Sequence, residues 1–248
     1  SLKAARDADG GAKYAPSSVA RALVAVRSFH RFCVDEGITE ADPSGDVGAP
    51  RVPQGIPKAL SEEEVDALLG AVEGDDPRAL RDRAILETLY GTGVRISELV
   101  GLDRVDLDLE DRLMRVLGKG SKERVVPMGR RAVAALQRYL AVRPQLVKPK
   151  SPGTVFLTRR GTAFAPVTLW LRIRNRVQRC GITRRVTPHM LRHSFASHVL
   201  QSSGDLRAVQ EMLGHAHIGT TQVYTRLDYQ HLAKAYDAAH PRARRKTP

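Results

Sequence analysis

The chain has 248 residues, and its 40 Lys and Arg outnumber its 27 Asp and Glu to give a formal net charge of +13. It has no run of about 18 or more apolar residues, which excludes a transmembrane helix. Cys33 and Cys180 are too few and too far apart for a disulfide scaffold or a cysteine-based zinc site. A chain this basic attracts polyanions, of which nucleic acid is the commonest. Its start lacks the pattern of a secretion signal, so we expect a cytoplasmic protein.

The first 50 residues predict one convincing helix, which Ser17 and Ser18 can cap and Gly37 can end. The apolar stripe of this helix consists of Ala22, Val26, Phe29 and Cys33. A stretch rich in Pro and Gly follows, and it favours an extended linker because proline fixes φ and lacks a backbone donor. We therefore predict a first domain at 1–50, a linker at 51–58 and a second domain at 59–248.

The second domain predicts helices around a small sheet. Ser61 and Glu64 have the spacing of a capping box, and Asp76-Pro77 opens a further helix. Short strands are expected at 105–107, 113–117, 124–126 and 154–157. Helices are expected from 61 and over 77–91, 94–101, 130–142, 166–179, 188–201, 205–213, 218–225 and 228–238. The fold class is therefore mainly α with a small antiparallel β-sheet.

Two segments of this domain carry cations at turns. In Gly91–Leu99 a flexible turn leads into a helix start at Arg95, where free N–H groups and a guanidinium together can hold a phosphate. The alternative is that Arg95 pairs with Glu98. In Gly118–Arg124 the side chain of Lys119 would lie at a hairpin tip, from which it can deliver a proton; the alternative is a solvated charged turn.

Two later segments carry titratable side chains. His189, Arg192 and His193 share one face of a predicted helix. A metal site on this pair of histidines would lack the glutamate of a zinc protease, and Arg192 would repel the cation. Downstream, His215 follows a helix end and Tyr224 follows it in turn; the alternative for Tyr224 is a packed aromatic side chain.

Taken together, these segments resemble the tyrosine recombinase (integrase) family. The motifs that carry the resemblance are Gly91–Leu99, Gly118–Arg124, His189–Ala196, Leu213–His215 and Thr220–Thr225. The resemblance runs from about Val19 to Arg245. Within the family, the motifs are most similar to those of the bacterial Xer type. The end of the chain, from Leu227 to Ala243, looks like the XerC branch of that type more than the XerD branch.

The resemblance implies a role for each matching side chain. Tyr224 would be the nucleophile that forms a 3′-phosphotyrosyl link with DNA, and Arg95 and Arg192 would hold the phosphate oxygens. Lys119 would protonate the leaving 5′ oxygen, His189 would help take the tyrosine proton, and His215 would add a hydrogen bond to the phosphate. One phosphodiester is exchanged for another, so neither a metal nor a nucleotide cofactor is implied.

The resemblance also implies an architecture and partners. A helical DNA-clamp domain, incomplete in residues 1–50, would precede the catalytic domain. A helix over 228–238, anchored by Leu232 and Tyr236 and followed by a basic tail, would dock on a neighbouring protomer. The implied partners are a dif-like site in double-stranded DNA, a XerD-like recombinase in a heterotetramer and an FtsK-like translocase at the septum. The implied process is resolution of chromosome dimers at cell division.

Three other functions remain open from the sequence. A phage or transposon integrase would use the same chemistry. A type IB topoisomerase would also use Tyr, Arg, His and Lys, but it acts alone and needs no docking tail. A non-catalytic basic DNA-binding module would have a structural Tyr224.

Overall fold

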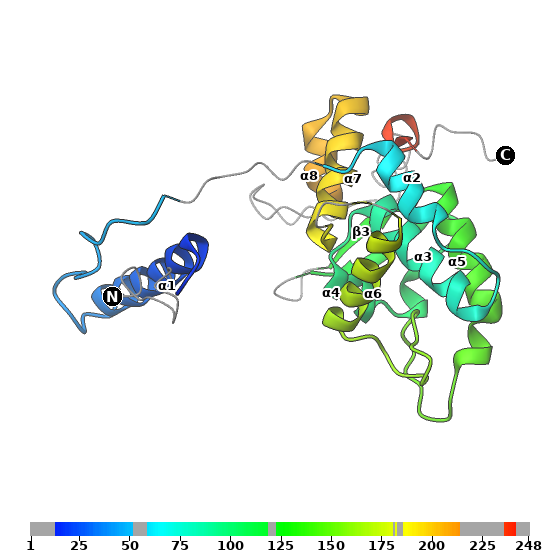
Figure 1. Ribbon diagram of the computed structural model, residues 1–248, viewed down its shortest axis with the longest axis horizontal. Helices are drawn as coiled ribbons and strands as arrows, with labels where there is room; N and C mark the ends of the chain where they lie inside the picture. Colours follow the sequence, from blue (N-terminus) through cyan, green and yellow to red (C-terminus); the bar gives the residue numbers. More distant parts are fainter. Residues whose placement is uncertain are drawn as a thin grey trace. The chain divides into compact units, whose positions relative to one another are not determined.

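The computed structural model describes residues 13–51, 59–118, 123–180, 182, 186–213 and 236–241 (Figure 1). The pattern of contacts divides the chain into two compact units, Ser1–Pro57 and Lys58–Pro248. The described residues form helices and one small antiparallel sheet, which is the predicted fold class. No helix among them is long and apolar enough to cross a membrane.

The first unit contains helix α1 (Pro16–Asp35). The prediction that Ser17 and Ser18 cap this helix is wrong, because Ala15 is the N-cap and the proline occupies the first turn. Proline suits that position, since its fixed φ is already helical and the N–H that it lacks would have no partner within the helix. The helix ends before Gly37, whose φ is +69°, as predicted.

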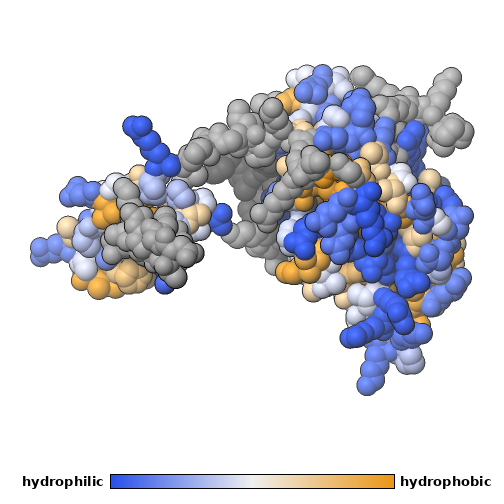
Figure 2. All heavy atoms as spheres, viewed as in Figure 1, coloured by the Kyte–Doolittle hydropathy of each residue, from blue (hydrophilic) through white to orange (hydrophobic). Residues whose placement is uncertain are grey.

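A single arginine folds the following loop back onto α1. Arg27 donates through Nε to the carbonyl of Ser44 and through Nη2 to those of Gly45 and Val47, over 3.4, 3.2 and 2.8 Å. Of the predicted apolar stripe only Cys33 is buried, whereas the side chain of Phe29 is 61% exposed. Apolar side chains therefore lie on the surface of this unit (Figure 2).

The second unit begins with the predicted capping box. In helix α2 (Glu62–Gly70) the Ser61 hydroxyl accepts from the Glu64 N–H over 3.2 Å, and the Glu64 carboxylate accepts from the Ser61 N–H over 2.8 Å. Leu60 and Val65, which flank this cap, are both buried. The reciprocal bonds satisfy donors that would otherwise be unpaired at the helix start, and they confirm the predicted boundary.

Helix α3 (Pro77–Thr92) is the centre of the second unit. Its start is fixed by Asp76, whose carboxylate accepts from the Arg78 N–H over 2.9 Å. Nearly every residue of α3 is buried, because α5 (Arg130–Val142) and α7 (Pro188–Ser203) pack against it (Figure 1). Because α3 is covered on nearly all sides, it has no single apolar face. The surrounding helices are positioned by their packing against it.

The sheet consists of β1 (Leu107–Asp108), β2 (Leu113–Leu117) and β3 (Glu123–Pro127) in the order β1-β2-β3, all antiparallel. Val116 is the register partner of Arg124, and Arg115 is the partner of Val125. Val116 is buried and Arg115 is exposed. Directly opposed residues share a face of the sheet, so Arg124 lies on the inner face with Val116.

The predicted strand at 105–107 is mostly wrong. Arg104–Asp106 form a 3₁₀ turn, and only Leu107 of the predicted range belongs to β1. The cause lies in Asp103, whose carboxylate accepts from the Arg104 N–H over 2.6 Å and whose own N–H donates to the Asp106 carboxylate over 3.1 Å. Short acidic side chains that bond to nearby backbone favour such turns over strands.

The predicted strand at 154–157 forms no ladder and makes only isolated bridges, Asp103 with Thr154 and Leu157 with Ala163. Its backbone groups are bonded elsewhere. The carbonyl of Val155 accepts from Arg143 Nε over 2.9 Å and from the Tyr139 hydroxyl over 3.1 Å. Side chains of α5 and of the 3₁₀ turn η2 (Arg143–Leu146) therefore take the place of a neighbouring strand.

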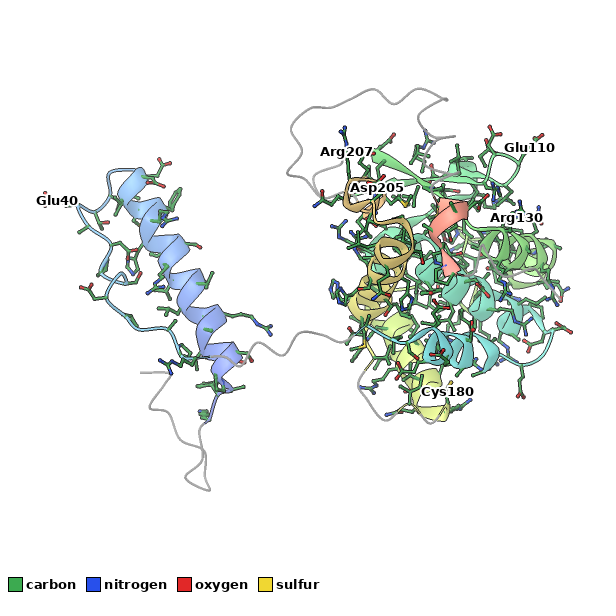
Figure 3. All side chains as sticks on the ribbon, turned by 90° about the horizontal axis from the view of Figure 1, so that it is seen from above. Glu40, Glu110, Arg130, Cys180, Asp205 and Arg207 are labelled. Carbon is green, nitrogen blue, oxygen red and sulfur yellow. The ribbon has the colours of Figure 1, made fainter. Side chains whose placement is uncertain are left out.

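The remaining helices follow the predicted ranges closely. They are α4 (Ile96–Gly101), α6 (Pro166–Arg179) and α8 (Leu206–Leu213). Figure 3 labels Cys180 at the end of α6, and Asp205 and Arg207 where α8 begins. The predicted helix at 218–225 and most of the one at 228–238 lie outside the described residues.

Residues 236–241 pack within the chain's own second unit. The ring of Tyr236 stacks with that of Phe195 at 6.3 Å between centroids and with that of His240 at 4.8 Å. Arg112 holds Asp237 through two bonds of 3.0 and 2.8 Å. The expectation that 228–238 dock on a neighbouring protomer stays a prediction.

Candidate phosphate-binding site

Arg95 lies in a sharp turn between two helices. Helix α3 ends at Thr92, and Gly93 follows in the left-handed region with φ +62°, donating its N–H to the Leu89 carbonyl over 3.1 Å. Helix α4 begins at Ile96, so Arg95 is its N-cap with extended backbone. This geometry confines Arg95 to a short connection whose two ends are both anchored in the core.

The carboxylate of Glu98 fixes both the backbone and the side chain of Arg95. Glu98 Oε2 accepts from the Arg95 N–H over 2.7 Å, and Oε1 accepts from Arg95 Nη1 over 2.8 Å. The side chain of Glu98 is 3% exposed, whereas that of Arg95 is 38% exposed. The alternative interpretation of the sequence, an ion pair between these residues, therefore holds, and it leaves part of the guanidinium open to solvent.

Arg124 on β3 contacts the same carboxylate from the other side. Its Nη1 donates to Glu98 Oε1 and its Nη2 to Oε2, each over 2.8 Å, which is a bidentate pair. Its Nε donates to the Met212 carbonyl near the end of α8 over 3.4 Å. One buried carboxylate thus links the start of α4 with the sheet, and Arg124 extends the link to α8.

Arg192 reaches the same region from α7. Its Nη1 donates to the carbonyl of Gly93 and its Nη2 to that of Leu213, the latter over 2.6 Å. Because Gly93 lies two residues before Arg95, this contact brings the two predicted clamp arginines to the same turn. Within the described part of the chain, both of these Arg192 hydrogen bonds go to backbone carbonyls and none goes to a carboxylate.

Burial and the neighbouring charges both shift the pKa values of Glu98 and Arg192. Burial opposes ionisation of Glu98, but hydrogen bonds from Arg124 and Arg95 outweigh it and lower its pKa from 4.5 to about 2. Burial, together with repulsion from Arg95 and Arg124, lowers the pKa of Arg192 from 12.5 to about 10. Glu98 and Arg192 are therefore both charged at neutral pH.

Three guanidinium groups and one carboxylate leave two positive charges at this site among the described residues. Fork-shaped guanidinium groups bind phosphate oxygens through paired hydrogen bonds. A site with this geometry and charge can hold a phosphodiester and stabilise the negative charge that develops on its oxygens during substitution at phosphorus.

The six predicted site residues divide into two groups. The structure brings Arg95 and Arg192 together, and it places His189 exposed on α7, one turn before Arg192. Lys119, His215 and Tyr224 lie outside the described residues. Strand β2 ends at 117 and β3 begins at 123, so the segment that contains Lys119 connects two paired strands.

Sequence reasoning missed Arg124 as a member of this cluster. The signal was weak but present, because Arg124 alternates with Val125 and shares its strand face with the apolar Val126. An arginine on the inner face of a strand needs a buried partner. Which carboxylate it meets depends on a contact across 26 positions of sequence, which no local pattern reveals.

Comparisons with known proteins agree on one family. The model of the phage integrase family matches residues 58–231. The tyrosine recombinase XerC 1 of Ralstonia nicotianae is 50% identical over 246 residues, covering 92% of this chain and 74% of that protein. The crystal structure of XerA recombinase matches with a TM-score of 0.61 at 31% identity, covering 93% of this chain and 74% of that one. The XerH site-specific recombinase bound to its difH substrate matches with a TM-score of 0.56 at 27% identity, covering 72% of this chain and 49% of that one.

Proposed function

Because the chain belongs to the phage integrase family and is a XerC-like site-specific tyrosine recombinase, we propose that it cuts and rejoins DNA strands through a covalent link to Tyr224. The single observation that supports this chemistry most strongly is the convergence of Arg95 and Arg192 at one turn with surplus positive charge. The proposed substrate is a phosphodiester of double-stranded DNA.

In the proposed reaction the Tyr224 oxygen attacks phosphorus, and the bond from phosphorus to the 5′ oxygen breaks. His189 takes the proton of the tyrosine hydroxyl, whose ordinary pKa near 10 disfavours ionisation at neutral pH. Lys119 gives a proton to the leaving 5′ oxygen. The products are a 3′-phosphotyrosyl link and a free 5′-hydroxyl, so the number of bonds to phosphorus is unchanged.

Arg95 and Arg192 hold the two non-bridging oxygens in this proposal, and His215 adds a hydrogen bond. The arginines suit this task because negative charge grows on those oxygens as the fifth bond to phosphorus forms. Their anchoring by Glu98 and by two backbone carbonyls keeps the donors in place before substrate arrives. Since the phosphotyrosyl link retains the bond energy for rejoining, the proposal includes no nucleotide and no metal.

The proposed partners follow from similarity to the XerC relatives. We infer a dif-like DNA site, a XerD-like recombinase in a heterotetramer and an FtsK-like translocase, with the protein in the bacterial cytoplasm at the nucleoid and septum. The support is the 50% identity to a XerC protein and the similarity to XerH bound to difH. In this setting the reaction resolves chromosome dimers at cell division.

A nicked suicide substrate tests the proposed reaction. Such a duplex loses the short strand that carries the 5′-hydroxyl, so the covalent complex accumulates. We expect wild type to form a DNA adduct that survives denaturation, and Tyr224→Phe to bind the duplex without forming it. Equal binding with no adduct from either protein would favour a non-catalytic DNA-binding module.

A further inference from the structure

We propose that Arg124 is a positioning residue for the recombination reaction, acting through Glu98 on Arg95. By sharing the carboxylate of Glu98, Arg124 leaves Arg95 with positive charge to offer the phosphate. This inference rests on the proposed function and assigns a role to a side chain outside the predicted catalytic set.

The carboxylate of Glu98 is saturated with hydrogen bonds. Its two oxygens accept four hydrogen bonds, two from Arg124 and two from Arg95. Arg124 takes the symmetric bidentate position, and Arg95 is left with one side-chain bond through Nη1. The rest of the Arg95 guanidinium is therefore not committed to Glu98.

The net charge around Arg95 depends on the presence of Arg124. Glu98 alone would neutralise Arg95, because a buried carboxylate and a single guanidinium cancel. With Arg124 on the same carboxylate the group of three carries one net positive charge, and Arg192 adds another. Burial lowers the pKa of Arg192, and repulsion from Arg95 and Arg124 lowers it further, which is consistent with this excess. A site for an anion needs such an excess, whereas a purely structural ion pair does not.

Arg124 lies where β3 meets the end of α8. Arg124 is the second residue of β3, directly after the segment that contains Lys119, and its Nε bonds the Met212 carbonyl. The next carbonyl along, that of Leu213, accepts from Arg192. The Arg124 side chain thus connects β3 with the turn that carries Arg95 and with the end of α8. The carbonyl at that end of α8 accepts from Arg192.

Rates of adduct formation on the suicide substrate at saturating DNA test this role. We expect Arg124→Gln to slow the first-order rate by about tenfold or more with little change in duplex affinity. Arg124→Lys keeps the charge without the bidentate geometry, so its rate should lie between those of wild type and Arg124→Gln. The matched control is Arg115→Gln, which removes a paired arginine from the opposite face of the adjacent strand and should react like wild type.

The double variant Glu98→Gln/Arg124→Gln separates positioning from folding. Removing the carboxylate as well restores the positive charge of Arg95, so the double variant should react faster than Arg124→Gln alone. Because Glu98→Gln also removes a buried charge that has lost its bidentate partner, the rates are compared only between variants of matched folded fraction. Thermal unfolding of each variant verifies that the compared proteins are folded, and Arg124→Lys provides the comparison if Arg124→Gln is not.

Two results would overturn the inference alone: wild-type rates for Arg124→Gln and Arg124→Lys, or a double variant no faster than Arg124→Gln. Absence of any adduct from wild type would instead overturn the proposed function, and the inference with it.

Discussion

The ring of Phe195 on α7 lies directly against Gly93. A Cβ added at residue 93 would lie 2.9 Å from Phe195 Cε1 and closer still to Cδ1, nearer than real Cβ atoms approach. The same glycine has φ +62° and gives its carbonyl to Arg192. The turn before Arg95 is therefore held against α7 by packing and by a hydrogen bond, and both depend on a residue without a side chain.

Gly93→Ala should destabilise the protein by about 2–4 kcal/mol, because the positive φ costs about 1 kcal/mol and the overlap with Phe195 adds a further overpacking cost. Urea unfolding measures the loss. Gly204→Ala is the matched control, since Gly204 has φ +67° and no heavy atom within 4 Å of its added Cβ. It should cost only about 1 kcal/mol. Equal losses at the two positions would contradict the packing argument.

Glu98→Gln should flatten the acid dependence of stability. The folded-state pKa of Glu98, about 2, lies below its ordinary value of 4.5, so its ionisation stabilises the fold above pH 4.5 and this stabilisation is lost as the pH falls toward 2. The full effect is on the order of 3 kcal/mol. Unfolding free energies of wild type and variant at pH 7 and pH 3 measure it. A variant that loses as much stability on acidification as wild type would contradict the assignment.

Arg192→Ala should reduce adduct formation by about 10²–10³-fold, because it removes a donor to the charge that develops on the phosphate. Duplex binding should stay mostly intact, since many other cations of this basic chain contribute to it. Arg138→Ala is the control, because Arg138 is 56% exposed and pairs with Asp75 on the surface. Loss of binding with an unchanged cleavage rate for the bound fraction would refute a clamp role.

Gly129→Ala should disturb the packing of Tyr236. A Cβ at residue 129 would lie 2.5 Å from the tyrosine hydroxyl oxygen and 2.9 Å from Cε1, whereas one at Gly101 meets nothing within 4 Å. We expect Gly129→Ala to cost about 1–3 kcal/mol and Gly101→Ala to cost less. In a Tyr236→Ala background the cost of Gly129→Ala should largely vanish. Additive losses would show that Tyr236 does not occupy this position in solution.

Much of the fold could be predicted because its boundaries are set locally. The capping box at Ser61, the proline after Asp76 and the helix at 130–142 each depend on neighbours a few residues away, and all agree with the structure. The failures at 105–107 and 154–157 arose where side chains of Asp103 and Arg143 bond to backbone that would otherwise form strands. These bonds from side chains to backbone depend on the tertiary fold, which the periodicity of apolar residues does not reveal.

The site could be predicted only in part. Short motifs pointed to Arg95 and Arg192 separately, and the structure brings them to one turn through the Gly93 carbonyl. The partner of Arg124 could not be foreseen, because it depends on which carboxylate faces the inner side of β3. The chemical roles of all six predicted residues, from Arg95 to Tyr224, stay predictions.

The most direct test is to identify the residue that carries DNA in the trapped complex. After nuclease and protease digestion, mass spectrometry should find a nucleotide joined through its 3′-phosphate to the peptide that contains Tyr224. A nucleotide on any other residue, or a link through a 5′-phosphate, would contradict the proposed reaction.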